Sequence, residues 1–208
     1  MSIKVIFLDV DGVLNSQAST SKCRFYIGID DDKVKRLNTI VNATGAKIVL
    51  VSSWKSHWHK IDKESQDEYG NYLDRKLNRE RLHIFDKTQI EDYDGSACPH
   101  RGEGILSWIG KLPEGSVENF IILDDEVFDY SSCNLLPHLV QTAFYSDIGG
   151  LTDEHVEIAI RLLNDGCGDK QQVCSGFVLC TECACAEDCD AREYQAGCYF
   201  GEKNKLKN

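Results

Sequence analysis

Short apolar runs recur along the chain, and each ends at polar residues. Residues 3–8, 46–51 and 119–123 are almost continuously apolar, which is typical of strands buried on both faces of a parallel sheet. Weaker runs of the same kind cover 82–85 and 139–144. The pattern therefore predicts strands at these five places.

Helical spacing of apolar residues alternates with the strand runs. It covers 30–42, which begins with an acidic turn and is followed by Gly45 as a stop signal, and it recurs at 73–81 and 102–109. Strands that alternate with helices imply right-handed crossovers and a parallel sheet covered on both faces. The predicted fold class is therefore α/β.

Side-chain positions in two helices follow from the same spacing. Within 102–109 it turns Ile105, Leu106 and Ile109 inward. Thr152 is expected to cap a closing helix, because its hydroxyl can accept from an early helical N–H. The inward face of that helix comprises Val156, Ile158, Ala159, Leu162 and Leu163.

Carboxylates gather where the predicted strands end. Asp9 and Asp11 follow the first strand, and Asp124 and Asp125 follow the strand at 119–123. Reacting groups of parallel sheets gather beyond the carboxyl ends of the strands. Confined like charges raise one another's pKa, and Mg²⁺ relieves this because it prefers oxygen ligands. We therefore predict a Mg²⁺ site built from these four residues.

Such a site suits phosphoryl transfer. A carboxylate beside the metal can attack phosphorus in line and give an aspartyl-phosphate, which water then hydrolyses. Asp9 is the predicted nucleophile. Asp11, carried beyond the strand by a turn at Gly12, is placed to protonate the leaving oxygen and later activate water. On its own, the D-x-D-G pattern is more often a turn or part of a calcium loop.

Phosphate binding also needs donors. Ser52 and Ser53 end the second strand, and either hydroxyl can face the phosphate. Arg101, just before a predicted helix, offers a planar cationic fork, and Lys87 is the second candidate for the cation. Taken singly, a serine pair is more often a helix cap and an arginine a surface residue.

In this order the residues resemble the haloacid dehalogenase (HAD) superfamily of phosphohydrolases. Asp9-Val10-Asp11-Gly12-Val13 resembles its first motif, Ser52 the second, Arg101 or Lys87 the third, and Asp124-Asp125 the fourth. The resemblance implies a Rossmann-like, five-stranded parallel sheet. It also implies an Asp9 nucleophile, an Asp11 acid/base, and Mg²⁺ held by Asp9, the Asp11 carbonyl and chiefly Asp125.

A narrower resemblance points to RNA repair. Residues 51–55, 101–105 with Trp108, and 150–152 are similar to the HAD domain of Swiss army knife RNA-repair proteins. The stretch between the first two motifs has room for a loop and a helix but not for a large cap domain. An open site of this kind suits a phosphoric monoester hydrolase that acts on an RNA or DNA end.

Candidates for contacting a nucleic acid lie beside the second motif. They are Trp54, His57, Trp58, His59 and Lys60, which could stack on a base and touch a backbone. Packing of a helix onto the sheet is the more common reason for aromatic residues at such a place. The net charge of −11 argues against broad nucleic-acid binding.

Two other functions remain open at this point. One is a small-nucleotide phosphatase. The other is a catalytically weak module that binds phosphate or nucleic acid, with the cysteine tail as its functional part. Retention of every motif residue disfavours the weak module.

The cysteines set the C-terminal part of the chain apart. A C-x-x-C spacing in a cytosolic protein favours tetrahedral zinc, with disulfides and a loosely ordered tail as alternatives. The candidate ligands are Cys180, Cys183, Cys185, Cys189 and Cys198. We expect a phosphatase domain at 1–164 and a Cys-rich tail at 165–208. Cys23, Cys98 and Cys133 are expected to be buried small hydrophobes.

Composition limits the remaining choices. The chain is 42% hydrophobic and 27% charged, which is ordinary for a folded protein. It has no apolar run of about eighteen residues and no basic N-terminal segment followed by an apolar stretch. We therefore expect a cytoplasmic protein with no membrane partner.

Overall fold

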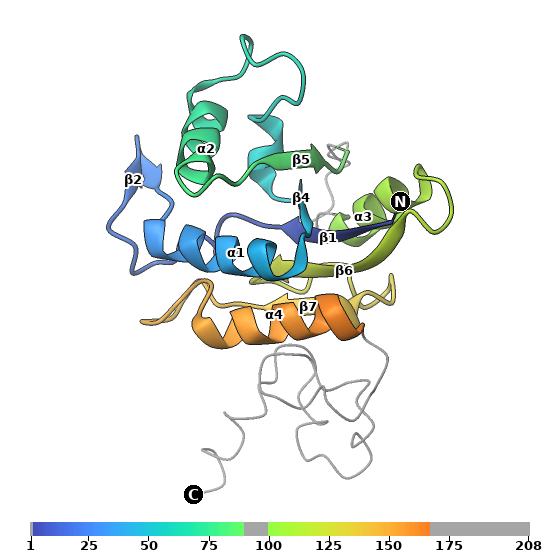
Figure 1. Cartoon of the computed structure of the whole chain (residues 1–208). Coiled ribbons are helices and arrows are strands. Elements are labelled where there is room, and N and C mark those ends of the chain that lie inside the picture. Colours follow the sequence, from blue (N-terminus) through green and yellow to red (C-terminus); the bar gives the residue numbers. More distant parts are fainter. Residues whose placement is uncertain (1, 90–99, 167–208) are drawn as a thin grey trace, which may run out of the picture.

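The computed structural model describes residues 2–89 and 100–166, which form an α/β fold (Figure 1). Its centre is a five-stranded, wholly parallel sheet in the order β5-β4-β1-β6-β7. The strands are β1 (Ile3–Leu8), β4 (Lys47–Leu50), β5 (Ile84–Lys87), β6 (Val117–Asp124) and β7 (Leu139–Gln141). This confirms the predicted class, and β1 lies in the middle because its apolar residues suit burial on both faces.

Helices cover both faces of the sheet. They are α1 (Asp31–Thr44), α2 (Glu68–Asn78), α3 (Arg101–Gly110) and α4 (Asp153–Asp165). Side chains alternate along a strand, so Ile6 and Leu8 of β1 pack with α1, α2 and α4, whereas Val5 and Phe7 pack with α3. Figure 1 shows α1 and α4 side by side on their face.

Element bounds differ from the prediction where local polar contacts decide them. The helix predicted at 73–81 begins at Glu68, because the Asp67 side chain caps it by accepting from the N–H groups of Tyr69 and Gly70. The weak strand predicted at 139–144 ends at Gln141. The Thr152 cap is confirmed, and His155 completes a capping box.

One predicted core position is wrong. Leu106 is 44% exposed, whereas Ile105 is fully buried. The inward stripe of α3 runs instead through Ile105 and Trp108, three residues apart. Trp108 packs edge-to-face on Phe7, with ring centroids 5.6 Å apart, and leaves Leu106 on the solvent side.

A small antiparallel hairpin lies between β1 and α1 and was not predicted from the sequence. It pairs β2 (Lys22–Cys23) with β3 (Tyr26–Ile27), and strands of two residues carry no readable period. The N–H of Ile29 donates to the Tyr72 hydroxyl at 2.9 Å, which anchors the hairpin to α2. With this hairpin and α1 filling the stretch before β4, the fold has no large cap there.

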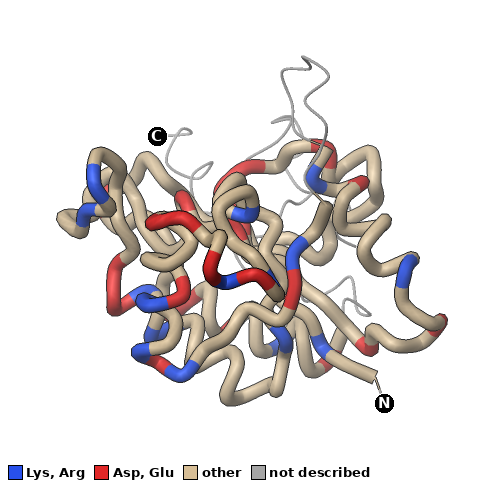
Figure 2. Tube along the Cα trace, turned by 90° about the horizontal axis from the view of Figure 1, so that it is seen from above, with Lys and Arg blue, Asp and Glu red and all other residues tan. Residues whose placement is uncertain are grey.

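Acidic and basic residues are interspersed on the side of the molecule that Figure 2 shows. On the side seen in Figure 2, blue and red segments alternate along the trace and form no broad basic face. In the described part of the chain, no helix is both long and apolar enough to cross a membrane.

The predicted cysteines divide between two parts of the chain. Cys23 is buried and Cys133 is half-buried. Cys98 and the candidate zinc ligands Cys180, Cys183, Cys185, Cys189 and Cys198 lie outside the described residues.

Candidate active site

The register of the central strands brings their polar ends to one level. Leu8 of β1 pairs with Leu50 of β4 and with Leu123 of β6. The N–H of Asp9 continues the ladder by donating to the Leu123 carbonyl at 2.9 Å. Asp9 and Asp124 therefore emerge side by side. One ligand oxygen from each of Asp9, Asp124 and Asp125 lies within 4.8 Å of the others.

Arg101, the first residue of α3, binds two of these carboxylates. Its Nη1 lies 3.1 Å from Asp9 Oδ2 and 2.7 Å from Asp124 Oδ2. Burial opposes the charge of Arg101, but the adjacent Asp9 and Asp124 prevail and raise its pKa. The Phe128 ring packs against the guanidinium, 4.0 Å from its centroid to the Arg101 carbon. Arg101 is therefore held as a fixed cation beside Asp9.

Asp124 has partners on both carboxylate oxygens. Besides Arg101, the Tyr130 hydroxyl donates to Oδ2 at 2.7 Å, and the N–H of Glu126 donates to Oδ1 at 3.1 Å. Its pKa is raised to about 8, chiefly by burial and then by the nearby charge of Asp9. These contacts make Asp124 the residue that positions Arg101.

Asp9 has one oxygen that nothing satisfies. The residue is 3% exposed, and its Oδ1 is the one buried side-chain nitrogen or oxygen in the described residues without a hydrogen-bond partner. Burial raises the pKa of Asp9, although Arg101 and the adjacent Ser52 hydroxyl work in the opposite direction. An unpaired buried polar atom costs free energy. Oδ1 is therefore open to a ligand or a reacting atom.

Asp125 completes the acidic cluster and explains Gly12. Gly12 has φ +78°, and a Cβ there would lie 2.2 Å from Asp125 Cγ. Only glycine lets the turn after β1 approach this carboxylate so closely. The pKa of Asp125 is raised to about 7, first by burial and then by Asp9. Three carboxylates facing one guanidinium form an oxygen-rich, negatively charged donor set, which fits Mg²⁺.

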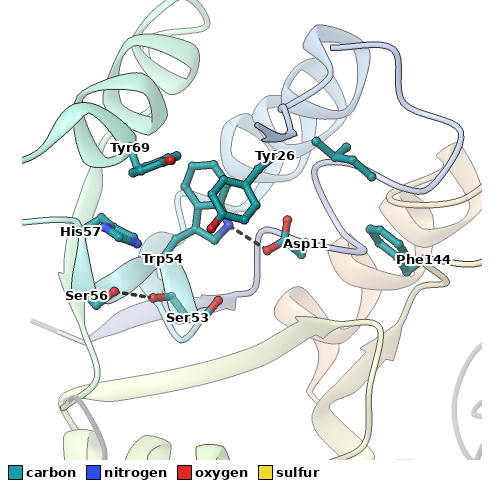
Figure 3. Close-up of a pocket in the computed structure, with 9 residues that line it drawn as sticks. Asp11, Tyr26, Ser53, Trp54, Ser56, His57, Tyr69 and Phe144 are labelled. Carbon is teal, nitrogen blue, oxygen red and sulfur yellow. Dashed lines mark hydrogen bonds between the residues drawn. The ribbon is translucent and has the colours of Figure 1, made fainter. Parts of the chain in front are cut away.

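The Asp11 carboxylate points elsewhere. Its Oδ1 accepts from Asn15 Nδ2 and its Oδ2 from Trp54 Nε1, each at 2.8 Å. Asn15 also accepts from the N–H of Gly12 at 3.0 Å, which ties the side chain to the turn. Figure 3 shows Asp11 facing a pocket beside Trp54. The carboxylate is thus fixed next to the acidic cluster but does not belong to it.

The predicted phosphate-binding residues separate into two groups. Ser52 is fully buried and lies beside Asp9, as Arg101 does. Ser53 is exposed and lines the pocket. Lys87 Nζ donates to the backbone carbonyls of Lys55, at 2.7 Å, and Trp58. The structure therefore brings Ser52 and Arg101 to the acidic cluster and uses Lys87 to fasten the segment after β4.

The pocket beside Asp11 has a volume of about 460 Å³ and largely aromatic walls. Its rings come from four segments: the hairpin, the turn after β4, the start of α2, and the loop after β7 (Figure 3). They belong to Tyr26, Trp54, His57, Tyr69 and Phe144. Tyr69 lies edge-to-face with Tyr26 and with Trp54, at centroid distances of 5.5 and 6.3 Å.

The residues beside the second motif that the sequence offered for contacting a nucleic acid do not all lie at the pocket. Trp58 is 2% exposed and its Nε1 donates to Asp74 at 2.9 Å, so it is a core residue. Lys60 pairs with Asp86 at 3.1 Å. Of the predicted set, Trp54 and His57 line the pocket, with Trp54 mostly covered.

Several residues of the site were missed by sequence reasoning. Asn15 had a signal, because it is a polar residue that directly follows Val13 and Leu14 next to the acidic motif. Tyr130, Tyr26, Tyr69 and Phe144 come from separate segments and join only in the folded chain. No local pattern marks them.

The parallel sheet, with Asp9 after β1 and the pair Asp124-Asp125 at the end of β6, is the core of an HAD-type protein. The family model for the HAD domain in Swiss Army Knife RNA repair proteins matches residues 5–156, and the chain belongs to this family. No curated protein and no solved structure matches the chain.

Proposed function

We propose that the protein is a Mg²⁺-dependent phosphomonoester hydrolase that works through an aspartyl-phosphate on Asp9 and acts on phosphorylated nucleic-acid ends. The observation that carries this proposal is Asp9 Oδ1, a buried carboxylate oxygen without a partner at the end of β1. The other oxygen of the same carboxylate, Oδ2, is held by Arg101. The RNA-repair context of the family supports a nucleic-acid substrate.

The residues divide the chemistry between them. Asp9 Oδ1 attacks phosphorus, and the bond to the leaving oxygen breaks as Asp11 delivers a proton to it. Asp11 then accepts a proton from the water that hydrolyses the aspartyl-phosphate. Asn15 and Trp54 keep the Asp11 carboxylate in place through both steps, since each donates to one of its oxygens.

Arg101 and Ser52 orient the nucleophile. Arg101 holds Oδ2 of Asp9, which leaves Oδ1 turned away from the guanidinium. The buried Ser52 hydroxyl lies beside the same carboxylate and is placed to donate to an incoming phosphate oxygen. Mg²⁺, which Asp9, Asp125 and Asp124 would hold with the Asp11 carbonyl, supplies charge neutralisation of the phosphate.

The proposal is tested by Mg²⁺-dependent phosphate release. Substrates are oligonucleotides with a 3′- or a 5′-phosphate and a small aryl phosphate. We expect Asp9→Asn to abolish release, whereas Asp32→Asn, which changes an exposed aspartate on α1, retains it. Failure of the Mg²⁺-loaded wild type to release phosphate from every substrate contradicts the proposal.

Zinc in the C-terminal tail is a separate part of the proposal and rests on the C-x-x-C spacing alone. Elemental analysis of the purified chain, with and without the residues after Asn164, tests it. We expect zinc only in the longer chain. Equal zinc content in the two chains rules the tail out as its ligand.

A further inference from the structure

The pocket beside Asp11 is larger than a phosphate group needs. Its volume of about 460 Å³ falls in the range of small-molecule sites, about 300–1,000 Å³. Tyr26, on the hairpin, leaves 62% of its surface exposed. It meets Tyr69 of α2 edge-to-face. The pocket therefore offers the largely exposed Tyr26 ring beside Tyr69, which itself packs partly against the core.

The position of the pocket connects it with the leaving group. Trp54 donates to the Asp11 carboxylate and also packs against Tyr69. In Figure 3, Trp54 stands between Tyr69 and Asp11. The group attached to a leaving oxygen that Asp11 protonates therefore extends into the aromatic pocket. Tyr69 lies further from the reacting atoms than Trp54 does.

The charges of the lining restrict what that group can be. Within the described residues, no Lys or Arg lines the pocket. Asp11 contributes a carboxylate, and the His57 imidazole is engaged with Asp67. A second phosphate or a carboxylate would find repulsion from Asp11 and no cation. A planar uncharged ring would find faces on which to stack.

We propose that this pocket binds the terminal nucleobase of a phosphorylated nucleic-acid end, packed against Tyr26 and Tyr69, so that the enzyme selects ends that retain their base. The inference rests on the proposed function for its phosphate chemistry. The Tyr69 face lies beyond Trp54, where a sugar-linked base reaches. The aryl group of a phosphotyrosine, bonded directly to the leaving oxygen, would remain next to Asp11.

The test compares two substrates that differ by one base. One oligonucleotide carries its terminal phosphate on an ordinary nucleoside and the other on an abasic sugar, each prepared with the phosphate at the 3′ and at the 5′ end. Stacking on an aromatic residue is worth roughly 1–3 kcal/mol per base, or about 5- to 150-fold. We expect kcat/KM to be at least about fivefold higher for the end with a base.

The variants locate the effect. Tyr26→Ala and Tyr69→Leu should lower kcat/KM for the end with a base by a larger factor than for the abasic end, so that the ratio of the two values falls towards one. Phe25→Ala is the matched control, since Phe25 lies on the same hairpin, is 94% exposed and does not line the pocket. It should leave the preference intact.

Each outcome separates the pocket from the phosphatase proposal. Equal hydrolysis of the two ends overturns the pocket inference and leaves the phosphatase function standing. Faster hydrolysis of a phosphotyrosine peptide than of either end also overturns it. If nothing is hydrolysed, the proposed function fails. Fluorescence anisotropy of the two labelled oligonucleotides then tests whether the pocket binds the base. Tighter binding of the end with a base supports the pocket, and equal binding overturns it.

Discussion

At the scale of single residues, charge balance governs the site. Asp9, Asp124 and Asp125 face Arg101, so the cluster carries more negative than positive charge once its carboxylates are ionised. The stability of the protein and the affinity of the site for a cation therefore depend on the same carboxylates.

Asp125→Asn separates these two effects. Because the pKa of Asp125 is raised from 3.8 to about 7 by burial and Asp9, the metal-free fold loses stability as the pH rises through this window, and the loss is complete above it. We expect the variant in EDTA at pH 8 to be more stable than wild type by on the order of 1 kcal/mol. Added Mg²⁺ should raise the Tm of wild type but not of the variant.

Differential scanning fluorimetry with and without Mg²⁺ measures both effects, and Asp32→Asn serves as the surface control. An Asp125→Asn protein that Mg²⁺ still stabilises as fully as wild type would show that the cation binds elsewhere.

Arg101 was the first and Lys87 the second candidate for the phosphate-binding cation in the sequence, and their contacts in the structure differ. Arg101→Lys loses the guanidinium whose Nη1 bridges Asp9 and Asp124 and which packs on the Phe128 ring, and we expect kcat to fall by about 100-fold. Lys87→Met loses bonds to backbone carbonyls, so it should lower Tm and change kcat only a few-fold. Steady-state kinetics that give the opposite order would reverse the assignment.

At the scale of elements, the first turn of α4 contains a buried titratable residue, His155, which belongs to the capping box. The His155 Nδ1 accepts from the Thr152 N–H at 3.0 Å, and Nε2 lies 3.1 Å from the Gln141 carbonyl. This arrangement suits the neutral ring, and burial lowers the pKa of His155 to about 4. The folded state thus resists a proton that the unfolded chain takes up near its ordinary pKa of about 6.5.

Stability should therefore fall as the pH drops from about 6.5 to about 4, because the unfolded state binds more protons over this window. His155 contributes on the order of 3 kcal/mol to the loss. Urea unfolding at several pH values measures it, with His155→Asn as the comparison. If both proteins show the same slope over this window, His155 is not the group responsible.

The elements that the sequence could predict are those whose signal is local. Continuous apolar runs located the strands, and the Thr152 cap located the start of α4. The start of α2 was missed because its cap, Asp67, lies in a polar stretch without periodicity. Strand-end carboxylates predicted the acidic cluster, whereas Tyr26, Tyr69 and Phe144 come together only through packing of distant segments.

At the scale of the whole molecule, charge distribution limits how a nucleic acid can be held. The net charge is −11, and basic residues are interspersed with acidic ones on the side shown in Figure 2. We expect few phosphate contacts along the strand on that side, so binding there should depend on the terminal phosphate and base.

A shallow salt dependence follows from that distribution. Between 50 and 200 mM salt we expect kcat/KM on a phosphorylated oligonucleotide to fall by less than about tenfold, whereas proteins with many phosphate contacts lose about 10³- to 10⁵-fold in affinity. A salt titration of initial rates measures the slope. A steep loss would reveal a basic track along the strand.

Trapping the phosphorylated enzyme tests the central claim most directly. Protein quenched in acid during turnover with Mg²⁺ is digested and analysed by mass spectrometry. We expect one phosphoryl group on Asp9, more of it in Asp11→Asn because hydrolysis of the intermediate is slowed, and none in Asp9→Asn. Turnover without phosphate on Asp9 in either wild type or Asp11→Asn would contradict the assignment of Asp9 as the nucleophile.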